Sequence, residues 1–188
     1  MLKIAITGNI AAGKSTVEKL LTDNGCLVFD TDEIAHQILD DSEEVKEVFS
    51  EYDILADGEI DRKKLAAVVF SNPHKLKQLE AIIHPKVRTE LLKIFSEHNC
   101  TLYVSVPQLF EAGFEDLFDK VIYINTDANI RLERLMKRNG LSKEEALKRI
   151  KAQIPDQEKI KKCDLIINNN GNQEDLEKEL TKIFELSK

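Results

Sequence analysis

The chain has 188 residues, 42% of them hydrophobic and 32% charged, with a formal net charge of −7 at pH 7. This length and composition are typical of one compact globular domain with room for an insertion. The acidic balance argues against nucleic acid as a main partner, which would call for a basic surface. A small anionic substrate stays possible, since a local group of cations can reverse the field inside a cleft.

The cysteines and the N-terminus predict a cytoplasmic protein. Cys26, Cys100 and Cys163 are odd in number and lack metal-site spacing, so we interpret them as reduced thiols. The opening MLKIAITGN leaves no room for a signal peptide, and no apolar run approaches the roughly 20 residues of a membrane helix. We therefore expect a monomer or weak homo-oligomer with no membrane partner.

Short apolar segments alternate with helical patterns along the chain. Residues 2–7 (LKIAIT) read as a strand buried on both faces. Further strands are expected at 26–29, 101–106, 120–124 and 164–167, and helices at 15–21, 130–137 and 175–186. This alternation predicts an α/β fold with a five-stranded parallel sheet covered on both faces.

The interval 31–100 is expected to hold helices alone and is longer than a plain crossover needs. It is either a decorative subdomain or a lobe that shapes a pocket for a second ligand. The local signals are a turn at Asp57-Gly58, an N-cap at Asp61 for a helix over 62–70, a helix start at Asn72-Pro73, and a kink or restart at Pro85. We expect one domain, 1–188, with a core of about 1–30 and 101–188 around this helical insert.

Residues 8–15 (GNIAAGKS) match the phosphate-loop pattern G-x-x-x-x-G-K-[ST]. Gly8 and Gly13 let the backbone turn so that its N–H groups point at phosphate, and the following helix adds its N-terminal partial charge. Lys14 can reach the β- and γ-phosphates, and Ser15 offers a hydroxyl to Mg²⁺. Because the motif lies between a strand and an amphipathic helix, it predicts binding of a nucleoside triphosphate with magnesium.

Three acids follow the second strand in LVFDTDEI, residues 27–34. The carboxyl end of that strand should open at the same sheet edge as the phosphate loop. Either Asp30 is a hydrolase's magnesium-binding acid with Glu33 activating water, or Asp32 takes the proton of an attacking hydroxyl. A third alternative is that Asp30 or Thr31 only caps the helix. The helical insert favours the base, since an alcohol needs an acceptor pocket and water does not.

A basic helix precedes a glycine-containing turn. Arg131, Arg134 and Arg138 recur at spacings of three and four, roughly on one face. Gly140 suits a helix end, and Ser142–Glu145 suits a capping box, so residues of about 138–155 resemble a hinged lid. Such arginines either lie on a solvent-exposed helix face or, in a phosphotransferase, bind the negative charge that develops on the transferred phosphoryl group in the transition state.

Seven motifs occur together in one order: GNIAAGKST, VFDTDEIAHQIL, ADGEIDRKKLAAVVFSNP, LEAIIHPKVR, VPQLFEAG, KRNGLSKEEALKRIKAQIP and CDLIINNNG. With them the chain resembles the dephospho-coenzyme A kinase family over roughly residues 4–171. The resemblance implies a P-loop transferase that moves the γ-phosphate of ATP, with Mg²⁺, to the ribose 3′-hydroxyl of dephospho-coenzyme A, the last step of coenzyme A biosynthesis. The alternatives are another P-loop small-molecule or nucleotide kinase, and a nucleotide-dependent switch, although the N-K-x-D of a guanine switch is absent.

The same resemblance implies site residues. Asp32 matches the proposed catalytic base, and Arg138 matches the lid contact, with Arg134 behind it. His84 matches the family's acceptor lobe, although a histidine before proline is also a common helix-break residue. Phe110 and Glu111 lie just beyond the third strand, where we expect them to border the acceptor site. The positions matched to the ATP site are Ala11, Ala12, Gly13, Lys14, Ser15, Thr16, Asn169 and Gly171, of which the last two could equally belong to a polar turn.

The chain also departs from the family pattern. Asn9, Ala11 and Ala12 stand in a loop that usually reads G-G-I-G-S-G-K-S, so we expect these alanines to keep a negative φ. Ser105 stands where an acid is common, which leaves the magnesium shell open. Two further differences are Gln108 in place of leucine and Asn168 in place of an acid.

Overall fold

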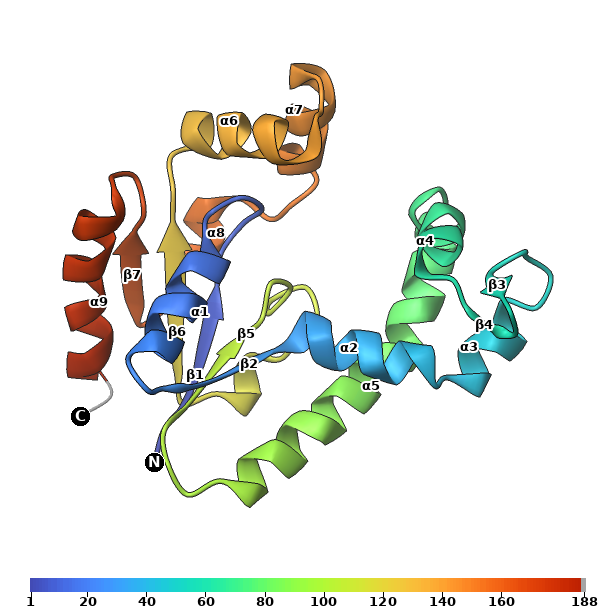
Figure 1. Ribbon diagram of the computed structural model, residues 1–188, viewed down its shortest axis with the longest axis horizontal. Helices are drawn as coiled ribbons and strands as arrows, with labels where there is room; N and C mark the ends of the chain where they lie inside the picture. The colour runs from blue at the N-terminus through green and yellow to red at the C-terminus, as the bar shows by residue number, and fades with distance from the viewer. Residues whose placement is uncertain (187–188) are drawn as a thin grey trace. The chain divides into compact units, whose positions relative to one another are not determined.

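The computed structural model describes residues 1–186 (Figure 1). The chain forms two compact units, which we call the core unit and the helical unit. The core unit combines Met1–Asp30 with the chain from His98 onward, and the helical unit is Thr31–Glu97. Within residues 1–186, no helix has both the length and the apolar character needed to cross a bilayer.

The core unit is built on a parallel sheet of five strands: β1 (Lys3–Thr7), β2 (Leu27–Asp30), β5 (Leu102–Ser105), β6 (Lys120–Asn125) and β7 (Leu165–Asn168). Their order is β2-β5-β1-β6-β7. The predicted α/β class and five-stranded parallel sheet are therefore confirmed. The second strand is parallel to the first, but β5 lies between them, so the carboxyl ends of β1 and β5 are direct neighbours.

The helices of the core unit are α1 (Lys14–Asp23), η1 (Glu115–Leu117), α6 (Ala128–Asn139), α7 (Lys143–Lys151), α8 (Asp156–Ile160) and α9 (Gln173–Leu186). Helices α1 and α9 lie side by side against the sheet (Figure 1). Their apolar faces and the central strands share one buried cluster: Ile4, Ile6, Val17, Leu21, Ile122, Ile124, Ile167, Leu176, Leu180 and Ile183. This packing holds the first turn of α1 at the carboxyl edge of β1.

The helical unit consists of α2 (Thr31–Asp40), α3 (Glu43–Val48), β3 (Leu55–Ala56), β4 (Glu59–Ile60), α4 (Arg62–Phe70) and α5 (Pro73–Glu97). The expectation of helices alone is wrong, because β3 and β4 pair antiparallel. Their connection is the predicted Asp57-Gly58 turn, with φ of 53° and 85°, as a two-residue hairpin loop requires.

Local capping signals in the helical unit are confirmed. Asp61 accepts hydrogen bonds from the backbone N–H groups of Lys63 and Lys64 and caps α4. Asn72 Oδ1 accepts from the His74 N–H at the start of α5. Pro85 lies inside α5 without ending it, so the predicted restart there is wrong. A proline removes one intrahelical hydrogen bond, and burial of Ile82, Ile83 and Val87 holds the helix through that position.

Candidate nucleotide-binding site

The phosphate loop connects β1 to α1 and contains two glycines that have no room for a side chain. A Cβ on Gly8 would lie 2.7 Å from the carbonyl oxygen of Ile124. Gly13, the N-cap residue of α1, has φ +92°, and a Cβ there would lie 2.1 Å from Asn169 Nδ2. Both glycines of the motif are thus required by close approach, and Gly13 also by its left-handed conformation.

Ala11 corrects one expectation from the sequence. Its φ is +61°, in the left-handed region, whereas a negative φ was predicted. The turn between Asn9 and Ala12, closed by a backbone hydrogen bond of 3.0 Å, imposes this conformation. An alanine in the left-handed region costs roughly 1–2 kcal/mol, because its Cβ crowds the next carbonyl. The loop therefore holds an alanine under strain at this position.

Lys14 and Ser15 begin α1 directly after the loop. The Lys14 ammonium donates a hydrogen bond of 2.8 Å to the Gly8 carbonyl, so its side chain lies back over the loop. Ser15 and Thr16 are exposed in the first turn, and that turn contains no acidic residue. A helix N-terminus whose first turn provides a lysine and two hydroxyls suits a bound anion.

Asn169 ties the loop to the end of β7. Its Nδ2 donates to the Ala12 carbonyl at 2.8 Å, and the same oxygen accepts from Thr126 Oγ1 at 2.8 Å. Arg134 on α6 donates to the Asn169 carbonyl at 3.1 Å. Asn169, predicted as an ATP contact, thus uses its side-chain amide to position the loop, and Arg134 is held beside it.

A pocket of about 270 Å³ opens next to this contact. Its lining brings together residues that lie far apart in the sequence: Gly13, Thr16, Arg134, Asn169, Gly171, Asn172, Gln173 and Leu176. Five of these were predicted site residues, from the loop, α6 and the segment after β7. A base bound here would lie beside the first turn of α1, with backbone and amide groups available to read its edge.

The other side of the loop is held by the segment after α7. Asn9 Nδ2 donates to the Ile154 carbonyl and to Asp156 Oδ1, both at 3.1 Å, and the Ile10 N–H donates to Gln153 Oε1 at 2.7 Å. Sequence reasoning missed these contacts, since about 145 residues separate their members. The signal that could have prompted a search was Asn9 itself, a polar residue replacing glycine.

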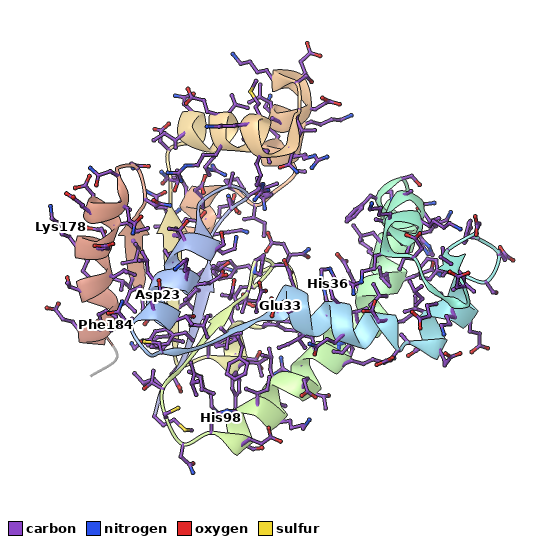
Figure 2. All side chains as sticks on the ribbon, viewed as in Figure 1. Asp23, Glu33, His36, His98, Lys178 and Phe184 are labelled. Atoms are coloured by element: carbon purple, nitrogen blue, oxygen red, sulfur yellow. The ribbon has the colours of Figure 1, made fainter. Side chains whose placement is uncertain are left out.

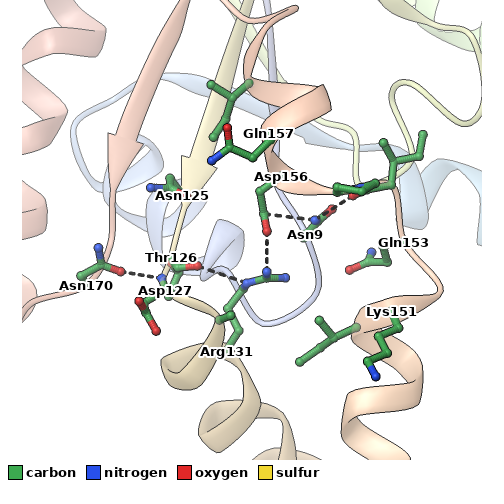
Figure 3. A pocket seen from close by; sticks show the side chains of 15 residues that line it. Asn9, Asn125, Thr126, Asp127, Arg131, Lys151, Gln153, Asp156, Gln157 and Asn170 are labelled. Carbon is green, nitrogen blue, oxygen red and sulfur yellow. Dashed lines mark hydrogen bonds and ion pairs between the residues drawn. The ribbon is translucent and has the colours of Figure 1, made fainter.

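Asp156 is the centre of this network (Figure 3). It accepts hydrogen bonds from Tyr123 and, at 2.6 Å, from Arg131 Nη2, while Arg131 Nε donates to the Thr126 carbonyl at 3.1 Å. Burial, and next the hydrogen bond to Asp156, hold the pKa of Tyr123 well above its usual range. Asn9, Arg131 and Asp156 line a pocket of about 610 Å³. The sequence grouped Arg131 with Arg134 and Arg138 on one helix face. In the structure its side chain instead binds Asp156 and the Thr126 carbonyl and so stabilises the fold.

The remaining predicted residues of the core unit lie near α6 and α8. Arg138 is exposed at the end of α6, where its Nε donates to Asn139 Oδ1 at 3.0 Å. Glu111 forms an ion pair of 2.7 Å with Lys159. The Lys162 Nζ lies 5.3 Å from the ring centroid of Phe110. The predicted helix end at Gly140, with φ +63°, and the capping box from Ser142 to Glu145 are confirmed.

Two predicted residues belong to the helical unit. Asp32 is exposed in the first turn of α2, two residues after β2 ends. His84 is half-buried on α5, and burial lowers its pKa, opposed by the charge of Glu80.

The donors at the loop fit Mg²⁺ held largely by phosphate. Residues 1–186 contain no group of three or more His, Cys, Asp or Glu side chains that could hold a metal ion by themselves. Mg²⁺ retains much of its hydration and is bound by few protein ligands together with substrate phosphates. The Ser15 hydroxyl, in the first turn of α1, is the side chain suited to that role.

Comparisons with known proteins agree with this geometry. The family model described as dephospho-CoA kinase matches residues 2–175. The chain belongs to the dephospho-CoA kinase family. Dephospho-CoA kinase from Geobacillus kaustophilus is 40% identical over 191 residues, which cover 97% of this chain and 95% of the relative.

Solved structures support the same assignment. The dephospho-CoA kinase from Campylobacter jejuni has a TM-score of 0.77 and 37% identity, with 98% of this chain and 96% of that chain covered. A shikimate kinase from Bacteroides thetaiotaomicron has a TM-score of 0.60 at 16% identity, covering 98% and 97%, and so shares the fold alone. Dephospho-CoA kinases use ATP with Mg²⁺, which agrees with the loop described above.

Proposed function

We propose that Asp32 is the base of the phosphoryl transfer carried out by this chain. As a member of its family, the chain is a kinase that phosphorylates dephospho-CoA to CoA with ATP and Mg²⁺. The observation that carries the proposal is the exposed position of Asp32 in the first turn of α2, two residues after β2 ends. The carboxyl ends of β2, β5 and β1 share one sheet edge, where ligands of open α/β sheets bind.

The proposed step is an in-line transfer to the ribose 3′-hydroxyl. A bond forms between the 3′-oxygen and the γ-phosphorus, and the bond from that phosphorus to the β–γ bridging oxygen breaks, leaving ADP. The hydroxyl proton passes to the Asp32 carboxylate, as in other kinases where an aspartate accepts the substrate proton. Positioned proton transfer of this kind contributes about 10²–10⁴-fold in rate.

The core unit supplies the nucleotide side of the proposed site. Loop residues Ala11 to Thr16 would bind the phosphates through backbone N–H groups and Lys14. Ser15 would hold Mg²⁺, which would neutralise phosphate charge there. Asn169 and Gly171 line the base pocket beside Gly13. Arg138 meets the charge that spreads over the transferred group, and Arg134, held by Asn169, lies behind it.

We assign the acceptor side to the insert of about 31–100 and to Phe110 and Glu111 after β5. In the insert, His84 is half-buried on α5, so its ring combines an apolar surface with a polar edge. The segment of about 138–155, with its capped turn at Gly140 and Ser142, acts as the lid. The family match supports the role of His84. The short basic turn between two helices supports the lid, and the position just after β5 supports Phe110 and Glu111.

We also propose that the enzyme works in the cytoplasm as a monomer or weak homo-oligomer, with neither nucleic acid nor membrane as a partner. Cys26, Cys100 and Cys163 are free thiols. Burial raises the pKa of Cys163 to about 12 and also raises the pKa of Cys26, so both stay protonated at neutral pH. The net charge of −7 supports the absence of a nucleic-acid partner.

One assay tests the acceptor and the base. Purified protein is incubated with ATP, Mg²⁺ and a panel of acceptors, and ADP and acceptor mass are followed together. We expect phosphorylated dephospho-CoA, and a fall in kcat of about 10²-fold or more for Asp32→Asn with little change in ATP affinity. Glu33→Gln, at the exposed neighbour labelled in Figure 2, is the matched control and should stay near wild type. Equal loss of kcat and ATP affinity in Asp32→Asn would assign the residue a metal or structural role.

A further inference from the structure

Ser105, the last residue of β5, holds a carboxylate from α1. Its hydroxyl donates a hydrogen bond of 2.5 Å to Glu18 Oε1. Ser105 is 1% exposed, and Glu18 is half-buried. A carboxylate that only covered the helix surface would lie in solvent, so this contact directs Glu18 toward the carboxyl edge of the sheet.

The position of Ser105 is one where P-loop enzymes use an acid. In such enzymes Mg²⁺ is held by the loop Ser or Thr and by an aspartate of the Walker B segment. Here β5 is the strand beside β1, with Ile6 paired to Ser105, and it ends in a hydroxyl. Asp30 is also in register with Ser105, but β2 is one strand further from β1, which adds about 4.8 Å.

Glu18 lies on the same side of α1 as Ser15. Residues three apart on a helix are neighbours on its surface, and helical side chains lean toward the N-terminus. The Glu18 carboxylate therefore covers the turn that contains Ser15, the proposed metal-binding hydroxyl. Helix α1 thus supplies both groups, and β5 supplies the serine that orients one of them.

We propose that Glu18 is the metal-side carboxylate of this kinase and that Ser105 is its positioning residue. The inference rests on the proposed binding of Mg²⁺ with ATP at Ser15. Mg²⁺ keeps several waters when bound to phosphates, and a carboxylate beside Ser15 would accept hydrogen bonds from such waters. Groups that orient such an acceptor by a hydrogen bond tune metal affinity about 10–100-fold. In this chain the acid comes from the helix and not from the strand.

The test measures metal binding without the acceptor. Mn²⁺ is titrated into the full-length protein with a β,γ-imido analogue of ATP, and free Mn²⁺ is followed by electron paramagnetic resonance. Glu18→Gln should weaken Mn²⁺ binding about 10-fold, and Ser105→Ala should also weaken it. Nucleotide affinity in EDTA should stay equal or increase in Glu18→Gln, because a negative charge near the phosphates is removed.

Two further variants make the test specific. Asp23→Asn, at the far end of α1 where Asp23 pairs with Lys19, should keep wild-type Mn²⁺ binding (Figure 2). The double variant Glu18→Ala with Ser105→Asp returns the acid to the strand and should regain at least part of the lost affinity. Unfolding temperatures are recorded for every variant, and if the double variant is unfolded, Glu18→Gln and Ser105→Ala decide.

Three results would overturn the proposal. One is unchanged Mn²⁺ affinity in Glu18→Gln. The second is a loss of nucleotide affinity in EDTA as large as the loss of Mn²⁺ affinity. The third is a loss of Mn²⁺ affinity found only in Asp30→Asn, which is measured in the same titration. A folded double variant without recovery would also count against it, since it would show that the carboxylate is not the active element. A wild-type kcat in Asp32→Asn would refute the proposed base and leave these metal readouts standing.

Discussion

Arg131 and Asp156 form an ion pair of 2.6 Å that joins α6 to the start of α8. The Arg131 side chain is 3% exposed, and its Nη1 has no hydrogen-bond partner within residues 1–186. Asp156 is therefore the carboxylate that balances a buried cation. The same carboxylate accepts from Asn9, so this pair also holds the first part of the phosphate loop.

Asp156→Asn should destabilise the protein by about 3 kcal/mol, because it leaves the Arg131 charge buried without a counterion. Arg131→Gln with Asp156→Asn should cost less than Asp156→Asn alone, since no charge then remains to be balanced. The measurement is urea unfolding of the two single variants and the double variant. Additive losses would show that the two residues are not coupled.

The features of the fold that could be predicted from the sequence are those that local signals determine. Asp61 precedes a helix of predicted and observed range 62–70, because an N-cap side chain acts only on the next two or three N–H groups. The strands were found because β1, β5 and β6 are continuous apolar segments buried on both faces. The β3–β4 hairpin was missed, since strands of two residues carry no periodicity to detect.

In the candidate site too, local motifs could be predicted from the sequence and long-range contacts could not. The phosphate loop and the Ser15 hydroxyl, which we propose as a magnesium ligand, follow from a motif whose glycines are required by the backbone conformation. The partners of the loop do not, because Asn169 and Asp156 reach it from more than 140 residues away. Glu18 belongs to no motif, and the hydrogen bond from Ser105 is what identifies it among the charged residues of α1.

Arg138→Ala should lower kcat about 10³-fold or more, as loss of a comparable arginine does in other phosphoryl-transfer enzymes. Because the Arg138 side chain is exposed at the end of α6, the unfolding temperature should change little. Steady-state kinetics with ATP and dephospho-CoA measure the effect. Lys137→Ala, the adjacent exposed cation, is the control and should keep near wild-type kcat. A comparable fall in both variants would point to general surface charge and not to the lid contact.

His84→Gln should reduce the loss of stability on acidification. Burial holds the pKa of His84 below its ordinary value of 6.5. As the pH falls through 6.5, the unfolded chain takes up a proton that the folded chain does not, so wild-type stability decreases from that point downward. When the pH is lowered from about 7.5 to about 5.5, the unfolding temperature should therefore fall less in His84→Gln than in the wild type. His74→Gln, at the exposed start of α5, serves as the control; an equal fall in all three proteins would contradict the prediction.

Ala11→Gly should stabilise the protein by about 1 kcal/mol, because glycine adopts the observed φ of +61° without the crowding of a Cβ. The gain is smaller than the full strain, since glycine also makes the unfolded chain more flexible. Ala12→Gly is the matched control in the same loop. Ala12 is 1% exposed and is not among the residues with positive φ, so this change removes a packed methyl group and should destabilise. Urea unfolding without nucleotide measures both variants, and destabilisation by Ala11→Gly would show that the left-handed turn is not under strain.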